Sequence, residues 1–461
     1  MEQFLRQLQT IPEAAELIRR VEEGGCPAAV SGLQPVQRAC VGAAVAAACG
    51  RPAVFLCGDE REVQVLSADL ETLTGKRPVT LLGREWQFRP GAVGSRDWER
   101  SRLAALYALA QGDAPVVVAT ADGLMARTLP PETLRSLAIT LEVGGQAELG
   151  ALAEQLLSAG YTRCEQVEGV GQFALRGGIL DVFSPLMDQP VRCEFFDDEI
   201  DSMGAFDPGT QRRTRNVSSA RILPAAEVLP HCAPGGLPGL ADQLTALAEK
   251  LAKKQKTEAI VQTLREDAER LRSGAAPGAA DRYLAAIYPT VTAGVHYLPP
   301  DAVVFLSESG RVDERVKNTV LQQKQDVEAL LSAGVLAGEY AHLTLTAEEL
   351  YAALEDFPVI LEDSLPTSRH PLRPRGLLTM NAKQLSSYGG SLETAVTDLE
   401  HYRSSGSAVL VLCGGETRAK NLHRLLEEKG IPATLDLSGA AMPAAGASPW
   451  GPCPLAASGR R

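Results

Sequence analysis

The stretch that decides the fold runs from Gly169 to Gln211 and reads GVGQFALRGGILDVFSPLMDQPVRCEFFDDEIDSMGAFDPGTQ. Apolar and polar residues alternate there in short runs, and turn signals interrupt the runs at Gly177-Gly178, Ser184-Pro185 and Asp207-Pro208-Gly209. The pattern predicts a small antiparallel sheet of about four strands.

The same alternation predicts which side chains share a face of that sheet. One face takes the apolar residues Phe173, Leu175, Val191, Cys193 and Phe195. The other face takes Gln172, Ala174, Arg176, Arg192, Glu194 and Phe196. Arginine and aromatic side chains are the usual anchors of protein-binding surfaces, so Arg176, Arg192 and Phe196 are candidate binding residues. The alternative is a solvated strand face whose single phenylalanine lies under a neighbouring loop.

Length and composition narrow the class of protein. A chain of 461 residues with 45% hydrophobic residues is long enough for about two to four domains. Its 57 acidic and 45 basic residues give a formal charge of −12, which argues against non-specific binding to DNA or to an anionic membrane. No signal peptide or membrane-length apolar run is visible, and we expect a cytoplasmic protein. The nine cysteines form no metal-binding pattern and are expected to be buried, reduced thiols.

Outside this stretch, strand-like and helix-like segments alternate, which predicts an α/β fold with a parallel sheet. The strand-like segments are 52–57, 79–82, 116–119 and 302–306, and the helical segments are 36–49, 60–73, 95–111 and 311–331. A helix at 148–159 introduces the antiparallel sheet, and helices at 240–252 and 258–272 follow it. A connector rich in proline and arginine at 364–375 precedes a smaller α/β unit.

Two places resemble a nucleotide site that has lost its chemistry. The loop after residues 28–30 contains Gly32 and Arg38, but it lacks the second glycine and the lysine that a phosphate-binding loop requires. At the end of the segment 302–306, Ser307 and Glu308 stand where an acid that holds Mg²⁺ is expected, and a serine at the first position supplies no anionic ligand. We therefore predict no catalytic residue, no metal site and no cofactor in this span.

Three motifs, at 171–183 (GQFALRGGILDVF), 190–202 (PVRCEFFDDEIDS) and 206–212 (FDPGTQR), resemble domain 2 of the excision-repair protein UvrB. The Phe-Phe-Asp-Asp-Glu run within them is similar to that of the transcription-repair coupling factor (Mfd) family. The resemblance implies a degenerate helicase-like (RecA-like) domain in two halves, 1–133 and 223–370, with a UvrB domain-2-like unit inserted at 134–222. It also implies a small domain at 376–437, followed by a tail at 438–461 that we expect to be disordered or out of frame.

The resemblance implies function and partners as well. Arg176, Arg192 and Phe196 match the positions that contact UvrA in the family, so this span is expected to recruit UvrA in transcription-coupled nucleotide excision repair. RNA polymerase and DNA would be bound only through family domains missing from this chain, which looks like an N-terminal portion and is expected to be a monomer. The competing hypotheses are an ATP-dependent DNA translocase, as in the full-length family member, and a UvrB-like subunit that binds damaged DNA.

Overall fold

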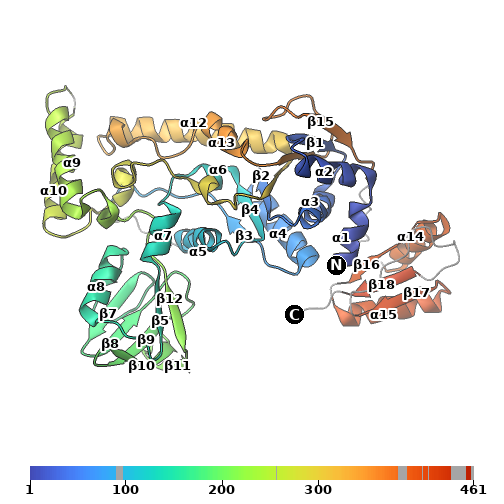
Figure 1. Ribbon diagram of the computed structural model, residues 1–461, viewed down its shortest axis with the longest axis horizontal. Helices are drawn as coiled ribbons and strands as arrows, with labels where there is room; N and C mark the ends of the chain where they lie inside the picture. Colours follow the sequence, from blue (N-terminus) through green and yellow to red (C-terminus); the bar gives the residue numbers. More distant parts are fainter. Residues whose placement is uncertain are drawn as a thin grey trace. The chain divides into compact units, whose positions relative to one another are not determined.

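The computed structural model describes residues 1–89, 97–255, 257–382, 392–407, 409–413, 415–437 and 453–457 (Figure 1). The chain divides into two compact units. The first comprises Met1–Ala53, Gln64–Pro78 and Pro358–Arg461, and the second comprises Val54–Val63 and Val79–Phe357.

The protein is an α/β protein with a parallel-sheet core, as predicted. The core has three strands in the first unit, in the order β15-β1-β14, and four in the second, in the order β13-β2-β4-β3. These strands are short, apolar and mostly buried, which is typical of parallel strands covered by helices on both faces. The finer assignment to a RecA-like domain stays a prediction, as do the predicted domain boundaries.

The first unit contains the N-terminal helices, three strands of the core and a smaller α/β part. Its elements are α1 (Glu2–Gln9), α2 (Pro12–Glu22), β1 (Ala28–Ser31), α3 (Pro35–Cys49), β14 (Val359–Asp363), β15 (Gly376–Thr379), α14 (Leu392–Ser404), β16 (Val411–Cys413), α15 (Glu416–Glu428), β17 (Ala433–Asp436) and β18 (Cys453–Ala457). Strand β1 pairs in parallel with β14 on one side and with β15 on the other. Helix α4 (Glu60–Thr74) has residues in both units.

The structure differs from the prediction in the C-terminal tail. Strand β18 lies between β16 and β17 and is parallel to both. The sequence predicts no ordered element in residues 438–461, whereas the structure has a strand at Cys453–Ala457. The other residues of this tail lie outside the described part of the chain.

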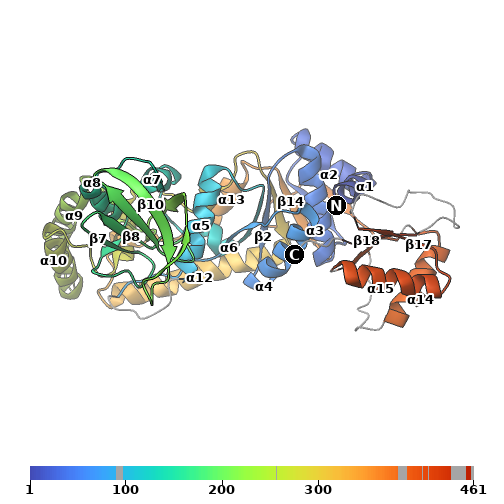
Figure 2. The same cartoon turned by 90° about the horizontal axis from the view of Figure 1, so that it is seen from below.

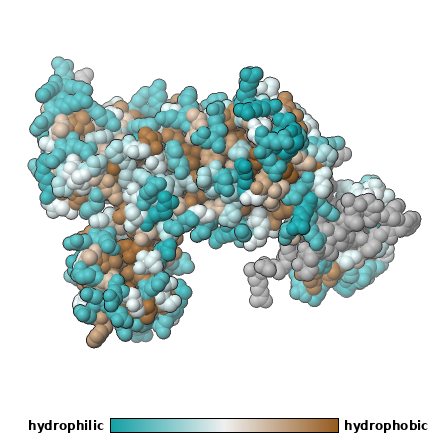
Figure 3. Space-filling model, viewed as in Figure 1, coloured by the Kyte–Doolittle hydropathy of each residue, from teal (hydrophilic) through white to brown (hydrophobic). Residues whose placement is uncertain are grey.

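The second unit holds the other strands and most of the helices. Its elements outside the antiparallel sheet are β2 (Ala53–Cys57), β3 (Val79–Leu81), α5 (Asp97–Gln111), β4 (Val116–Thr120), α6 (Ala121–Met125), α7 (Pro131–Leu137), η1 (Pro230–Cys232), α9 (Gly236–Leu251), α10 (Glu258–Arg272), η2 (Ala280–Tyr283), α11 (Leu284–Ile287), η3 (Gly294–Tyr297), β13 (Val303–Ser307), α12 (Ser309–Ser332), η4 (Gly338–Tyr340) and α13 (Ala347–Leu354). Helices α9 and α10 lie side by side, and their visible face is largely hydrophilic (Figures 1 and 3). No helix in the described ranges is long and apolar enough to cross a membrane.

The antiparallel sheet is larger than predicted. It has six strands in the order β11-β10-β9-β8-β7-β6, in which the edge strand β6 is parallel to β7 and the other neighbours are antiparallel. Helix α8 (Leu149–Ser158) lies beside it (Figure 2). The strands are β6 (Thr162–Arg163), β7 (Gln172–Arg176), β8 (Ile179–Val182), β9 (Val191–Phe196), β10 (Glu199–Phe206) and β11 (Arg213–Asn216). A separate pair, β5 (Ile139–Glu142) with β12 (Ser219–Ile222), joins the start and end of this region. The prediction missed the two outermost strands, because β6 has two residues and β11 is a polar run without alternation.

One face of this sheet packs on α8 and forms the core of the region. Leu152 and Leu156 of α8 meet Phe173 of β7 and Cys193 of β9 in one buried cluster. Burial also raises the pKa of the Cys193 thiol to about 12, so this cysteine is an inert apolar side chain at neutral pH. This core fixes the register of the strands and thereby fixes which side chains point to the opposite, outer face.

Candidate protein-binding surface

The three predicted binding residues lie together on the outer face of the sheet. Arg192 of β9 stands directly opposite Asp181 of β8, and Arg176 ends the neighbouring strand β7. Phe196 ends β9. The predicted core-facing residues Val191, Cys193, Phe173, Leu175 and Phe195 all belong to the cluster under α8. The face assignment made from the alternation is therefore confirmed for both strands.

A buried carboxylate, Asp181, holds both arginines in place. Arg192 donates from Nε to Asp181 Oδ1 at 2.7 Å and from Nη2 to Oδ2 at 2.8 Å. Arg176 donates from Nη2 to Asp181 Oδ2 at 2.6 Å. The Asp181 side chain is fully buried, whereas 48% of the Arg176 side chain and 21% of that of Arg192 are exposed. Asp181 thus fixes two guanidinium groups at the surface of the sheet.

Sequence reasoning missed Asp181, although a signal was present. It is an acid inside an apolar strand, Ile179–Val182, where an unpaired carboxylate would be costly to bury. Such a residue requires cationic partners on the neighbouring strands. The sheet register supplies one of them, Arg192, directly across from it.

The two arginines have different surroundings. Arg192 donates to Asp181 from both Nε and Nη2, and its Cζ atom lies 4.7 Å from the centre of the Phe206 ring. Its hydrogen bonds to Asp181 raise its pKa above the usual value for arginine, so it is charged at all ordinary pH values. Arg176 has one hydrogen-bond partner in the described part of the chain, Asp181, and is half exposed, which leaves further N–H donors directed to solvent. Arg176 is therefore better placed than Arg192 to bind a carboxylate of another protein.

Phe196 is the exposed aromatic residue of the outer face. It is 80% exposed, whereas its neighbour Phe195 packs against the core. Phe196 pairs with Glu199 across a tight turn in which Asp197 has a φ of 57°. A large apolar side chain held this far out of the core stabilises the fold little and is available to a partner.

One end of the outer face is closed, contrary to the prediction. Ala174 is fully buried with Phe206 and Phe183, because residues 164–170 cover that end of the sheet and contribute Val167 to the same cluster. The alternation assigned Ala174 to solvent since it cannot register a covering loop. The open part of the face lies around Arg176 and Phe196.

The loop at Gly32, which the sequence marks as a degenerate nucleotide site, makes its contacts within the chain. Gly32 has a φ of 90°, and a β-carbon there would overlap the Met380 carbonyl oxygen. The Leu33 amide donates to Asp363 O at 3.3 Å, and the Gln34 amide donates to Gln37 Oε1 at 2.8 Å. Amides that would bind a phosphate in a functional loop are thus engaged within the first unit. Arg38 is buried and donates from Nη1 to Leu33 O at 3.1 Å.

The second predicted nucleotide position lies in the second unit. Ser307 is buried at the end of β13 and donates to Glu62 Oε1 at 2.7 Å. Glu308 follows with a φ of 55° at the start of α12. The described residues contain no cluster of histidine, cysteine, aspartate and glutamate suited to a metal ion. The eight cysteines from Cys26 to Cys413 are free, as expected, but only Cys57 and Cys193 are buried and the other six are partly buried, which corrects the expectation of buried thiols.

The part of the chain that carries this surface is similar to known proteins. Residues 139–227 match the family described as the UvrB interaction domain. The transcription-repair-coupling factor of Bacillus subtilis (strain 168) is 26% identical over 423 residues, which is 91% of this chain and 36% of that protein. The factor of Myxococcus xanthus is 29% identical over 423 residues, covering 87% of this chain and 34% of that protein. That of Staphylococcus aureus (strain USA300) is 25% identical over 346 residues, covering 73% of this chain and 28% of that protein.

The resemblance to transcription-repair-coupling factors is confirmed. The chain spans about a third of the length of the two relatives named first. The outer face of the sheet, with Arg176, Asp181, Arg192 and Phe196, lies inside residues 139–227, and this matching region is called the UvrB interaction domain below.

The UvrB interaction domain ends at Glu227, which lies in a second cluster of arginines around a carboxylate. Arg102 Nε is 3.0 Å from Glu227 Oε1, Arg84 Nη1 is 3.6 Å from Oε2, and Thr128 Oγ1 donates to Oε2 at 2.6 Å. The side chains of Glu227, Arg84 and Arg102 are 0%, 1% and 2% exposed. Burial opposes ionisation of Glu227, but Arg102 and Arg84 outweigh it and lower its pKa. This cluster joins the end of the interaction domain to α5 and the segment after β3.

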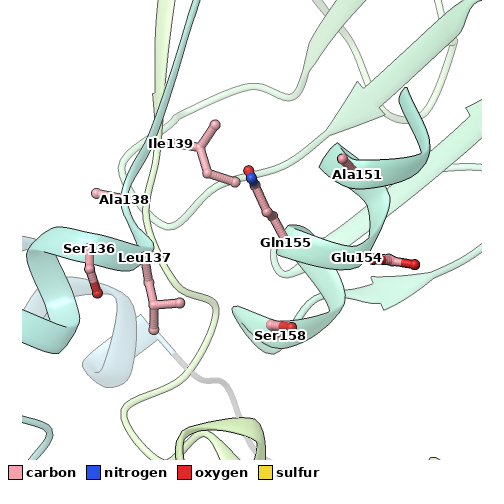
Figure 4. Close-up of a pocket in the computed structure, with 8 residues that line it drawn as sticks. All are labelled: Ser136, Leu137, Ala138, Ile139, Ala151, Glu154, Gln155 and Ser158. Atoms are coloured by element: carbon pink, nitrogen blue, oxygen red, sulfur yellow. The ribbon is translucent and has the colours of Figure 1, made fainter. Parts of the chain in front are cut away.

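A groove with a volume of about 490 Å³ lies at the base of the UvrB interaction domain (Figure 4). Its lining comes from the end of α7, the start of β5 and one face of α8: Ser136, Leu137, Ala138, Ile139, Ala151, Glu154, Gln155 and Ser158. Four of these residues are exposed and four are partly buried, and no described hydrogen bond joins a nucleophile to a base among them. The groove is a surface depression without the groups that catalysis requires.

Proposed function

We propose that the UvrB interaction domain of this chain recruits UvrA, and that the chain thereby acts in transcription-coupled nucleotide excision repair. The match of residues 139–227 and the similarity to transcription-repair-coupling factors support this role. The outer face of the sheet is the proposed contact surface, with Phe196 as the apolar anchor and Arg176 as the residue that pairs with a carboxylate.

The exposure of Phe196 is the observation that carries the proposal. Burying a phenylalanine side chain is worth about 1.5–3 kcal/mol, and Phe196 forgoes most of this in the free chain because it is 80% exposed. Two arginines fixed on a buried acid stand on the same face. An aromatic anchor beside preorganised arginines is the composition of a binding hot spot.

We also propose that this span does not hydrolyse ATP. The loop at Gly32 lacks the lysine and has its amides occupied, and Ser307 cannot replace an acidic metal ligand. Its parallel-sheet core would then act as a scaffold that carries the UvrB interaction domain. ATP hydrolysis by the purified chain that persists after controls for contaminating ATPases would contradict this proposal.

Calorimetry with purified UvrA tests the binding role. Phe196→Ala should weaken binding by at least about 1 kcal/mol, since it removes the apolar anchor. The free energy of unfolding should change by less than about 0.5 kcal/mol, because an exposed side chain is removed. Leu157→Ala is the matched control: it removes an apolar side chain that is 41% exposed on α8, beside the sheet's other face, and should leave binding unchanged. Equal affinities for wild type and Phe196→Ala would refute the proposed surface.

A further inference from the structure

The outer face of the sheet contains a third arginine that comes from the edge strand β11. Gly204 of β10 stands opposite Arg192 on one side and Asn216 on the other, so it lies on the same face as the binding residues. A β-carbon at Gly204 would overlap the guanidinium group of Arg213. The missing side chain at Gly204 therefore provides the space through which Arg213 reaches across the sheet.

Hydrogen bonds hold Arg213 in this position. Its Nη2 donates to Met203 O, and its Nη1 donates to Ser202 Oγ at 3.3 Å. Ser202 in turn donates to Glu194 Oε2 at 2.7 Å. Met203 and Ser202 lie on the neighbouring strand β10, so these bonds orient the guanidinium group along the outer face. They leave further N–H donors of Arg213 for a partner.

Arg213 differs from the other two arginines in its charge balance. Arg176 and Arg192 share the carboxylate of Asp181, whereas no carboxylate in the described ranges forms an ion pair with Arg213. Arg213 is also exposed. Its positive charge is thus the least compensated on this face, and its most favourable partner is a carboxylate on another protein.

We infer that Arg213 is a specificity-determining residue of the UvrA-binding face, where it pairs with an acidic side chain of the partner. The inference rests on the proposed function. It adds a residue from β11, a strand that carries none of Arg176, Arg192 and Phe196. Gly204 has the supporting role, because it keeps the path of the Arg213 side chain open.

An edge strand also carries charged residues simply to prevent pairing with other chains. Arg215 is the internal comparison for that role. It is exposed on the same strand and pairs with Ala205, whose side chain belongs to the buried side of the sheet. Edge protection would treat Arg213 and Arg215 alike, whereas partner recognition on the outer face requires only Arg213.

Binding of UvrA to three variants of the full chain separates these roles. Arg213→Ala should weaken binding by about fivefold or more and reduce its dependence on salt, because one charge pair is lost. Gly204→Ala leaves Arg213 in the sequence but displaces its guanidinium group, and it should reproduce the loss. Gly204 has no left-handed φ, so alanine fits the backbone. Arg215→Ala makes the same change of charge and should alter binding by less than about twofold.

Two outcomes would overturn the inference. One is unchanged binding by Arg213→Ala; the other is an equal loss in Arg213→Ala and Arg215→Ala. Thermal unfolding of each variant shows whether a loss comes from misfolding, and a Gly204→Ala variant that folds and binds like wild type would also count against it. Phe196→Ala, measured in parallel, keeps the two proposals distinct: if it abolishes binding while Arg213→Ala does not, only the role of Arg213 fails.

Discussion

Two clusters in the second unit place two arginines around a buried carboxylate, Asp181 or Glu227, with opposite consequences; at Glu227, Arg84 also pairs with Asp281 at 2.5 Å. At Asp181, the arginines come from neighbouring strands, and 48% of the Arg176 side chain remains exposed. At Glu227, Arg84 and Arg102 are 1% and 2% exposed. The chemistry of the two clusters is nearly the same, but solvent reaches only the first.

The difference teaches that access to solvent, rather than charge pairing, distinguishes the proposed recognition surface from an internal ion-pair cluster. A sealed ion pair contributes no contact to a partner, and removing one member leaves an uncompensated buried charge. An ion pair at a surface is worth little to stability, but it fixes the direction of its arginines before a partner arrives. Both clusters lie within or at the end of the UvrB interaction domain, so the contrast can be tested in one chain.

Removing the carboxylate of the sealed cluster should have the largest effect. Glu227→Ala leaves Arg102 buried without its ion-pair partner, while Arg84 keeps Asp281, and it should lower the free energy of unfolding by about 3–5 kcal/mol. Urea denaturation followed by circular dichroism measures the change. Glu249→Ala, which removes an exposed acid of α9, is the control and should be nearly neutral. A loss below about 1 kcal/mol in Glu227→Ala would show that water compensates the arginines and that the cluster is not sealed.

The same change at the exposed cluster should cost less stability and more function. Asp181→Ala should lower the free energy of unfolding by about 2 kcal/mol, because solvent can hydrate the arginines that lose their partner. UvrA binding should fall more than stability explains, since Arg176 and Arg192 are no longer held in place. Asp188→Ala removes an exposed acid of the same domain and serves as the control. If a folded Asp181→Ala variant bound UvrA with wild-type affinity, Asp181 would not be needed for binding.

The pH dependence of stability should show the smallest effect, and it arises at the sealed cluster. The pKa of Glu227 is lowered from 4.5, so its ionised form is favoured in the folded state. The stability that it contributes is complete above the unfolded-state value of 4.5 and is lost as pH falls through the lower folded-state value. The advantage of wild type over Glu227→Gln in urea denaturation should therefore shrink in acid. An advantage that is unchanged by acid would mean that Glu227 is not ionised in the folded protein.

Much of the fold was predictable because local periodicity reports buried faces. Helix α10 was predicted at 258–272 and is found at Glu258–Arg272, where Ile260, Leu264 and Leu271 recur at helical spacing. The start of α9 was missed by four residues, since Gly236 and Pro238 in its first turn resemble a loop. Strands β6 and β11 were missed because neither has an apolar alternation, and pairing with neighbours alone makes them strands.

The candidate site divides in the same way. Alternation was sufficient to place Arg176, Arg192 and Phe196 on one face. It gave no sign that Ala174 is covered by residues 164–170, or that Asp181 holds the arginines. It also gave no sign that Gly204 and Arg213 are in contact, because the residues are nine positions apart and meet only through the pairing of β10 with β11.

The sequence by itself determined the α/β class, the central antiparallel strands and the polar face of these strands, because these depend on short-range periodicity and on residue type. It also determined that the loop at Gly32 lacks the lysine for phosphate binding. Only the tertiary structure decided which arginines share a carboxylate, which are buried and which stay exposed. The reason is physical: exposure and ion pairing depend on strand register and on covering loops, which bring together residues that are distant along the chain.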